Sequence, residues 1–283
     1  MSQSTSFEMR QGLPGEGRLG VMDALSMGWQ LLKGDFWNLW LVGLLFYALM
    51  VASSGVPFGY VLAGPPLMAG LFYVIARRID GRPAAVAEIF EGFRQRFGQS
   101  IVAMLPLMLA GAASGLVVVP IILMGVLAGA AGGAAADSEE IFGLIFGGTM
   151  CLTYAAFLVL IVGVAVFGWF FTFAPLAVWT HPESGWEAAK ISMRLVWRNL
   201  WSVVGFHLLF WLIGCAGALA GYLTCCVGFL FVVPALVVWY YASVAYLYRS
   251  WTGQPLVQPI TASEAAAEGG PIPPTSIEPP AGT

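Results

Sequence analysis

His207 is the one ionisable side chain of note inside the long uncharged stretches of this sequence. An imidazole can gain or lose a proton near neutral pH, so with a nearby hydroxyl it could act as a general base in an intramembrane enzyme. Ionisable groups within membrane helices are costly and often functional. We favour a simpler interpretation, in which a neutral imidazole is hydrogen-bonded to a hydroxyl or carbonyl on a neighbouring helix.

The other residue types that carry chemistry form no recognisable catalytic or metal-binding motif. Ser114 resembles a nucleophile turn only loosely, and the sequence places no carboxylate where it could orient His207. The second histidine, His181, is remote in sequence and there is no CxxC pair, so a metal ion would lack ligands. We therefore expect no enzyme activity, no cofactor and no nucleic-acid partner.

The four cysteines all map towards the outer ends of their predicted helices. Cys215 and either Cys225 or Cys226 flank the last outer turn, so an oxidising periplasm could close a disulfide there. Alternatively these thiols, with Cys151, act as small apolar packing residues, which is the interpretation that we favour.

Membrane helices must position all of these residues, because 59% of the chain is hydrophobic and only 10% is charged. A soluble domain carries about 25% charged residues, and a span needs about 20 apolar ones. The uncharged stretches predict an all-α bundle with six spans, at 36–54, 58–77, 101–127, 150–179, 201–220 and 227–248. Pro106 and Pro120 favour one long, kinked or tilted helix in the third span, and we expect the Gly-rich segment 141–149 at the outer interface.

The charges predict the orientation. All twelve Lys and Arg residues can be placed on one side of the membrane, which leaves only Asp137, Glu139 and Glu140 on the other. This distribution indicates a multi-pass protein of the bacterial inner (plasma) membrane with both termini in the cytoplasm. The spans form a domain over 20–252, between a flexible segment 1–19 and a Pro-rich tail 253–283 that we expect to be disordered.

Three amphipathic stretches on the cytoplasmic side divide the domain into units of about 20–83, 84–183 and 184–252. Their apolar faces are Met22, Leu25, Trp29 and Leu32 in the first, Val86, Ile89, Phe93 and Phe97 in the second, and Trp186, Ala189, Met193, Val196 and Leu200 in the third. The units begin and end inside, so they form a possible parallel repeat. The residues 77–83 and 249–255, which leave the first and third units, share the spacing of Arg, Gly and Pro.

We expect the three amphipathic stretches to lie in the inner membrane interface. Their bases and those next to them are Lys33, Arg77, Arg78, Arg94, Arg96, Lys190, Arg194 and Arg198. Each base near the surface favours anionic lipid by about 1 kcal/mol. In one interpretation the amphipathic stretches only anchor and orient the spans, and in the other they bind a cytoplasmic partner. Glycines four residues apart, as in Gly217 and Gly221, predict close helix packing within the protein or with a second copy.

Two segments carry a family resemblance: Trp29…Lys33…Phe36-Trp37, and Gly64-Pro65-Pro66…Gly70…Arg77-Arg78…Gly81-Arg82-Pro83. Over about residues 20–255 the chain resembles polytopic inner-membrane proteins of proteobacteria that include the BPSS family. The resemblance implies a six-helix membrane protein of unknown activity and carries over no functional residue.

Three functions agree with these patterns. The leading expectation is a non-enzymatic scaffold or accessory protein that binds lipids or partner proteins. The alternatives are an uncoupled transporter or channel for a small solute, and an intramembrane enzyme that uses His207.

Overall fold

The computed structural model describes residues 19–56, 58–135, 139–181, 184–223 and 227–253, and most of these are helical, with no strand among them. The elements are α1 (Val21–Gly34), α2 (Phe36–Ser54), α3 (Gly59–Ile79), η1 (Val86–Phe90), α4 (Glu91–Gln95), α5 (Phe97–Ala135), α6 (Glu139–Trp169), α7 (Ala174–Thr180), α8 (Gly185–Arg198), α9 (Leu200–Leu223) and α10 (Val227–Thr252). Six helices in the described residues are long and apolar enough to cross a membrane. The predicted all-α fold with six membrane-length helices is confirmed.

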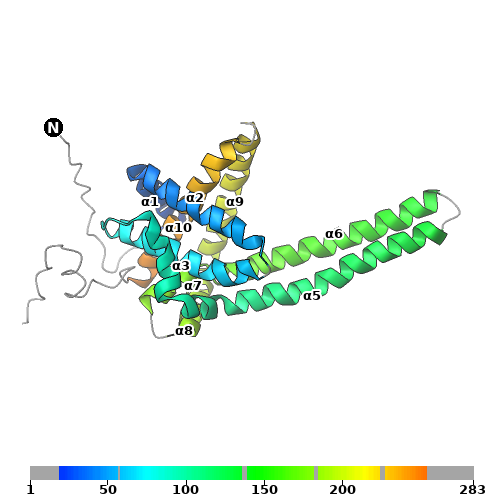
Figure 1. Cartoon of the computed structure of the whole chain (residues 1–283), viewed down its shortest axis with the longest axis horizontal. Helices are drawn as coiled ribbons and strands as arrows, with labels where there is room; N and C mark the ends of the chain where they lie inside the picture. Colours follow the sequence, from blue (N-terminus) through cyan, green and yellow to red (C-terminus); the bar gives the residue numbers. More distant parts are fainter. Residues whose placement is uncertain (1–18, 57, 136–138, 182–183, 224–226, 254–283) are drawn as a thin grey trace, which may run out of the picture.

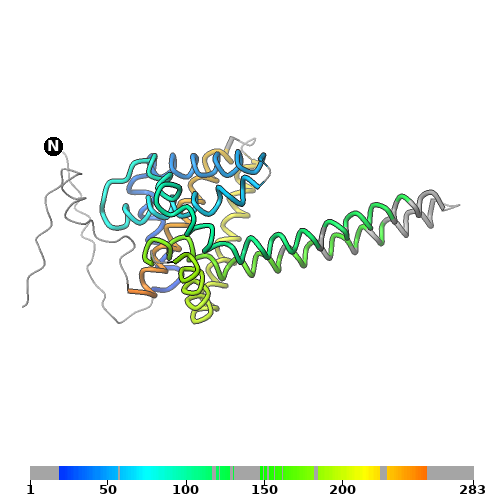
Figure 2. Tube along the Cα trace, turned by 60° about the horizontal axis from the view of Figure 1, so that its bottom comes forward, coloured from blue at the N-terminus to red at the C-terminus, as the bar shows by residue number. Residues whose placement is uncertain are grey.

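The long helices form three hairpins, α2–α3, α5–α6 and α9–α10, which extend from a base made of the shorter elements (Figure 1). The α5–α6 and α9–α10 hairpins leave the base in different directions, and α5–α6 extends far beyond the other two (Figures 1 and 2). Large apolar side chains on this hairpin, such as Leu116 and Leu158, are exposed. In water such a surface would be unfavourable, so its exposure fits lipid contact.

The predicted spans agree well with α2, α3, α9 and α10, but the second unit differs. α5 runs unbroken through Pro106 and Pro120 for 39 residues, because each proline removes one hydrogen bond and leaves the rest of the ladder in place. The segment 141–149, expected at the outer interface, is helical and belongs to α6. The fourth predicted span, 150–179, is divided into α6 and α7 by a turn at residues 170–173.

Ser192 stabilises this turn. Its Oγ accepts a hydrogen bond from the Phe173 N–H at 3.2 Å and donates one to the Phe170 carbonyl at 2.7 Å. Pro175 follows in the first turn of α7, where a missing N–H costs little. Ser192 is fully buried in α8, where polar groups need hydrogen-bond partners. Its hydroxyl pairs with two backbone groups that the break between α6 and α7 would otherwise leave unpaired.

The apolar core lies at the base and around α3. Phe72, Leu71 and Ile75 of α3 are fully buried, as are Phe173 next to α7 and Tyr248 of α10. α3 contacts α2, η1, α4, α5, α7 and α10, so it is the central helix of the described structure. Most of α3 is buried within the protein, whereas α9 and the α5–α6 hairpin are largely exposed.

Each amphipathic stretch packs on the last helix of the preceding unit, and the first stretch packs on the last helix of the third unit. α1 contacts α10, η1 and α4 contact α3, and α8 contacts α7. Two indole N–H groups join the units at 2.8 Å, from Trp239 to the Leu25 carbonyl and from Trp179 to the Ala69 carbonyl. Gly81 and Gly253, matched in sequence, both adopt positive φ, of 74° and 67°. A threefold arrangement would produce such contacts, and the repeat itself stays a prediction.

The amphipathic faces are therefore used for packing inside the protein as well as for any membrane contact. Leu25 and Leu32 of α1 are buried against the rest of the base, whereas Met22 of the same predicted face is exposed. The second stretch forms a 3₁₀ turn and a short helix instead of one helix, with Ile89 fully buried.

Candidate functional site

His207 is held in place by its own helix. Its Nδ1 lies 2.8 Å from the carbonyl oxygen of Val203, one turn earlier in α9. A carbonyl can only accept, so Nδ1 carries the hydrogen and donates it. The ring of Trp169 stacks on the imidazole with centroids 5.0 Å apart, and Phe206 meets it edge-on. The ring orientation is thus fixed by one hydrogen bond and two aromatic neighbours.

The opposite nitrogen faces two hydroxyl groups from other elements. Nε2 lies 3.0 Å from Tyr240 Oη of α10 and 3.3 Å from Thr172 Oγ1 in the α6–α7 turn. In the neutral ring with Nδ1–H, Nε2 has a single lone pair to offer. We infer that the nearer Tyr240 hydroxyl donates to it. The Thr172 hydroxyl is in turn hydrogen-bonded to Tyr240, so the donors of the cluster are used within it, while both hydroxyl oxygens keep free lone pairs.

A cavity of about 280 Å³ lies beside this cluster. His207, Tyr240 and Thr172 form its polar side together with Tyr241, and its apolar side includes Met68 of α3 and residues of α5. No Asp, Glu, Lys or Arg is among its described lining residues. The cavity can therefore hold a hydrogen-bonding group, while an ion placed there would lose its hydration without a countercharge.

The sequence identified His207 and predicted its type of partner, but it missed Thr172 and Tyr240. They are 35 and 33 positions away, and hydroxyl residues are too common in apolar helices to be singled out. The only local signal is the proline that follows Thr172, since it predicts a break that could point a side chain inward. In a Ser-His-Asp triad a carboxylate holds Nδ1, whereas here a backbone carbonyl does so.

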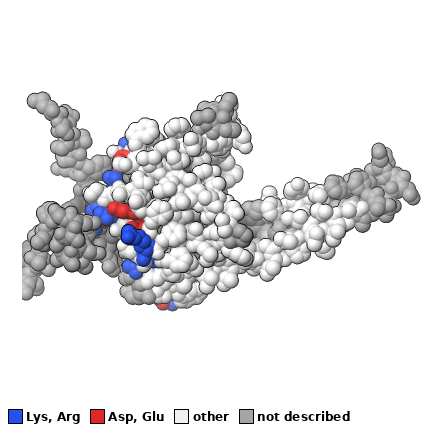
Figure 3. Space-filling view, viewed as in Figure 1, with Lys and Arg blue, Asp and Glu red and all other residues white. Residues whose placement is uncertain are grey.

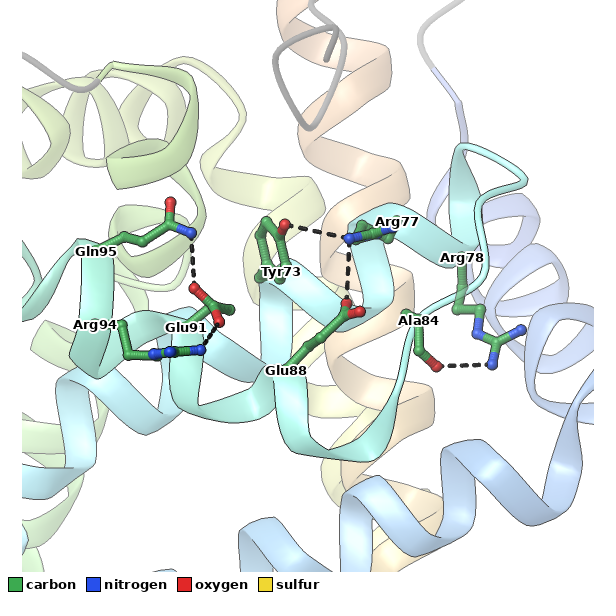
Figure 4. A network of polar contacts seen from close by, with 8 residues as sticks. All are labelled: Tyr73, Arg77, Arg78, Ala84, Glu88, Glu91, Arg94 and Gln95. Atoms are coloured by element: carbon green, nitrogen blue, oxygen red, sulfur yellow. Dashed lines mark hydrogen bonds and ion pairs between the residues drawn. The ribbon is translucent and has the colours of Figure 1, made fainter. Parts of the chain in front are cut away.

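The Lys and Arg residues that the sequence suggested for binding lipid or a partner have different environments, and Figure 4 shows three of them. Arg77 pairs with Glu88 at 3.5 Å, and Arg78 pairs with Asp35 at 2.9 Å while donating to the Ala84 carbonyl. These two arginines connect the end of α3 to η1 and to the start of α2. Their role is to hold the base together, because their charged groups are already engaged within it.

Three further basic residues contact neighbouring side chains. Arg94 pairs with Glu91 at 3.0 Å and is largely exposed. Lys33 lies over the ring of Trp29 and Arg96 over the ring of Trp179. Burial lowers the pKa of the Arg96 guanidinium from its usual value, as expected for a cation removed from water.

α8 presents the remaining bases together with tryptophan. Its small residues, such as Ala188 and Ala189, face inward, whereas Trp186 and Trp197 are exposed. The bases Lys190, Arg194 and Arg198 are exposed on the same helix, and Trp201 at the start of α9 is 84% exposed. We name this row the α8 stripe: Trp186, Lys190, Met193, Arg194, Trp197, Arg198 and Trp201. Lys190 pairs with Glu187, whereas Arg194 and Arg198 make no ion pair with a described residue.

The charges seen in Figure 3 gather at the base, and the visible part of the α5–α6 hairpin that is described shows none. The described Lys and Arg residues lie in α1, α4 and α8, in the connections that flank η1 and α4, and at the C-terminal ends of α3 and α10. Cys151 and Cys215 are free and exposed. The predicted disulfide falls on Cys225 or Cys226, which lie outside the described residues, as do segment 1–18 and the tail from 254.

Comparison with protein-family models, curated proteins and solved structures finds no match to this chain. The resemblance to the BPSS family therefore stays a prediction, and no functional residue comes from a relative.

Proposed function

We propose that this chain is a non-enzymatic, lipid-binding scaffold of the bacterial inner membrane, with both termini in the cytoplasm and the base at the inner leaflet. The α8 stripe is the observation that carries the proposal. Exposed tryptophan favours the headgroup boundary, because its ring is apolar and its N–H can reach polar groups. Exposed Arg and Lys attract anionic headgroups.

The arrangement within the stripe supports lipid phosphate as the bound group. Arg194 and Arg198 are one turn apart on the exposed side of α8, and Met193 and Trp197 lie beside them. A guanidinium offers several N–H donors in a fork that fits phosphate oxygens. The apolar neighbours would contact the glycerol and upper acyl region of the same lipid, so headgroup charge and membrane depth are recognised together.

The test is lipid retention by the full chain purified in mild detergent. Wild type and the double variant Arg194→Gln/Arg198→Gln would be incubated with phosphatidylglycerol or phosphatidylcholine, and bound lipid measured by native mass spectrometry. With about 1 kcal/mol for each base, we expect the double variant to bind phosphatidylglycerol roughly thirtyfold more weakly. Phosphatidylcholine binding should be weak in both proteins.

Arg94→Gln is the matched control, because Arg94 is an exposed base of the same surface that already pairs with Glu91. It should retain lipid like wild type. Equal retention by the double variant and wild type, or equal loss in the control, would refute the role of the α8 stripe. Proteins that co-purify with wild type and not with the double variant would indicate that the stripe binds a protein partner instead.

A further inference from the structure

We propose that the cavity beside His207 is a binding site for a small neutral amphiphile that carries a hydroxyl group on an aromatic ring, the phenol class of compound. This inference does not rest on the α8 stripe. It rests on the volume of the cavity, the hydrogen-bonding atoms that converge on it and the aromatic rings that line it.

The size limits the ligand. At about 280 Å³ the cavity is slightly smaller than most ligand pockets in proteins, which cover roughly 300–1,000 Å³. A single ring with a short apolar substituent fits this range, whereas a whole phospholipid does not. The described lining residues contribute atoms from α3, α5, α9, α10 and the α6–α7 turn, so the ligand would touch all three units.

The polar atoms select a neutral hydroxyl. Tyr240 donates to His207 Nε2 and Thr172 is hydrogen-bonded to Tyr240, so what the two hydroxyl groups offer a ligand is the lone pairs of their oxygens. A ligand hydroxyl can donate its hydrogen to one of these oxygens, whereas an ether or a hydrocarbon cannot. An ionised carboxylate or amine would enter without a countercharge among the described lining residues, and this is strongly unfavourable.

The aromatic walls favour a ring over a simple chain. Trp169 stacks on the His207 ring with an interplanar angle of 27°, and the rings of Tyr240 and Tyr241 in α10 meet nearly at right angles. Phe171 adds a buried ring from the α6–α7 turn. Stacked and edge-to-face ring pairs are favourable beyond the area that they bury. Met68 and Met104 complete the cavity with adaptable apolar side chains.

The experiment uses the full chain in lipid nanodiscs and equilibrium dialysis, with empty nanodiscs subtracted. The probe is radiolabelled para-hexylphenol, compared with para-hexylanisole, hexylbenzene and para-hexylbenzoate. We expect saturable binding of the phenol, weaker binding of the ether and the hydrocarbon, and the weakest binding of the anion. Equal binding of phenol and hydrocarbon, or preferential binding of the benzoate, would overturn the proposal.

Two variants remove one hydroxyl each with little change in shape, Tyr240→Phe and Thr172→Val. Each should weaken phenol binding by about three- to tenfold, the usual effect of one hydrogen bond, and should leave ether binding nearly unchanged. Thr172→Ser keeps the hydroxyl and should keep the affinity. If a variant fails to fold, the four probes on wild type still decide the proposal.

Tyr222→Phe is the matched control, because Tyr222 is exposed near the far end of α9. It should bind the phenol like wild type, and an equal loss would show that the site is elsewhere. The double variant Arg194→Gln/Arg198→Gln should also bind the phenol normally. Loss of lipid binding and loss of phenol binding are therefore separate results, so either proposal can fail alone.

Discussion

Ser192 and His207 are both polar side chains in apolar surroundings, but their hydrogen-bonding capacity is used differently. Ser192 is fully buried and gives its hydroxyl to two backbone groups of the α6–α7 turn. His207 uses Nδ1 in the same way, yet its Nε2 side opens on hydroxyls beside a cavity. The first arrangement stabilises the fold, whereas the second leaves hydrogen-bonding groups available to a ligand.

The sequence could predict His207 because an ionisable group is rare in a membrane span. It could not predict Ser192, since serine is common and its role depends on a break 19 to 22 positions away. The pairing of Arg78 with Asp35 was missed for the same reason, because only the fold brings the end of α3 to the start of α2. Residue types predict which groups need partners, and tertiary packing decides what those partners are.

Asp80 at the end of α3 gives a prediction about pH. Burial raises the pKa of its carboxyl above the ordinary value, while Arg249 and Arg82 oppose the shift. A raised folded-state pKa contributes stability that is present below the unfolded value of about 3.9 and is lost as pH rises through the folded value. We expect Asp80→Asn to flatten the dependence of melting temperature on pH in this acidic window, measured in detergent.

Arg249→Gln provides the complementary variant. Arg249 donates to Asp80 Oδ1 at 3.0 Å, so its removal takes away the strongest opposing charge. The pKa of Asp80 should rise further and the loss of stability should move to higher pH. Identical pH profiles for wild type and Asp80→Asn would show that this carboxyl does not govern the transition.

At the scale of the elements, the length of uncharged sequence predicted four of the long helices closely. α2 and α9 begin and end within a few residues of their predicted bounds. The break between α6 and α7 was not predicted, because the proline signal at Pro175 is shared with α3 and α10, where prolines lie inside continuous helices. Whether a proline breaks a helix depends on partners such as Ser192, which a local pattern does not contain.

The packing of α4 on α3 depends on Gly92 and leads to a second prediction. A Cβ at Gly92 would collide with the Pro66 carbonyl and the Gly70 nitrogen, both of which are backbone atoms of α3. Gly92→Ala should therefore lower the free energy of unfolding by about 1–3 kcal/mol, measured by denaturant titration in mixed micelles. Gly111→Ala is the control, since nothing lies within 4 Å of a Cβ there.

The Gly111 control should be neutral or stabilising by up to about 1 kcal/mol, because alanine favours helix more than glycine does. If Gly92→Ala were as stable as this control, the result would contradict the close packing of α4 on α3.

At the scale of the whole molecule, the charge distribution predicted one basic side, and the described bases indeed lie on the base of the structure. What the sequence could not predict is the divergence of the hairpins (Figure 1). The arrangement of the hairpins depends in part on contacts between elements that are far apart in the chain, such as α1 with α10 and α3 with α7.

The orientation itself leads to a third prediction, made in a variant whose four native cysteines are replaced by serine. A cysteine that replaces Asp137 should react with a membrane-impermeant maleimide in spheroplasts, because the proposed orientation assigns that position to the outer side. A cysteine that replaces Arg82 should react only after the membrane is permeabilised, since positive residues are retained in the cytoplasm. The reverse labelling pattern would refute the proposed topology.

The 39-residue α5 has a consequence for the bilayer that surrounds it. At 1.5 Å per residue it is about 58 Å long, nearly twice the roughly 30 Å of hydrocarbon in a typical membrane. Between its first residue and the turn to α6 no charge fixes the depth of the helix. Keeping this whole length among acyl chains requires a lean of about 60° from the membrane normal. Thin bilayers would demand a steeper lean and thick ones a more upright hairpin, so acyl-chain length would set the angle at which this arm meets the base.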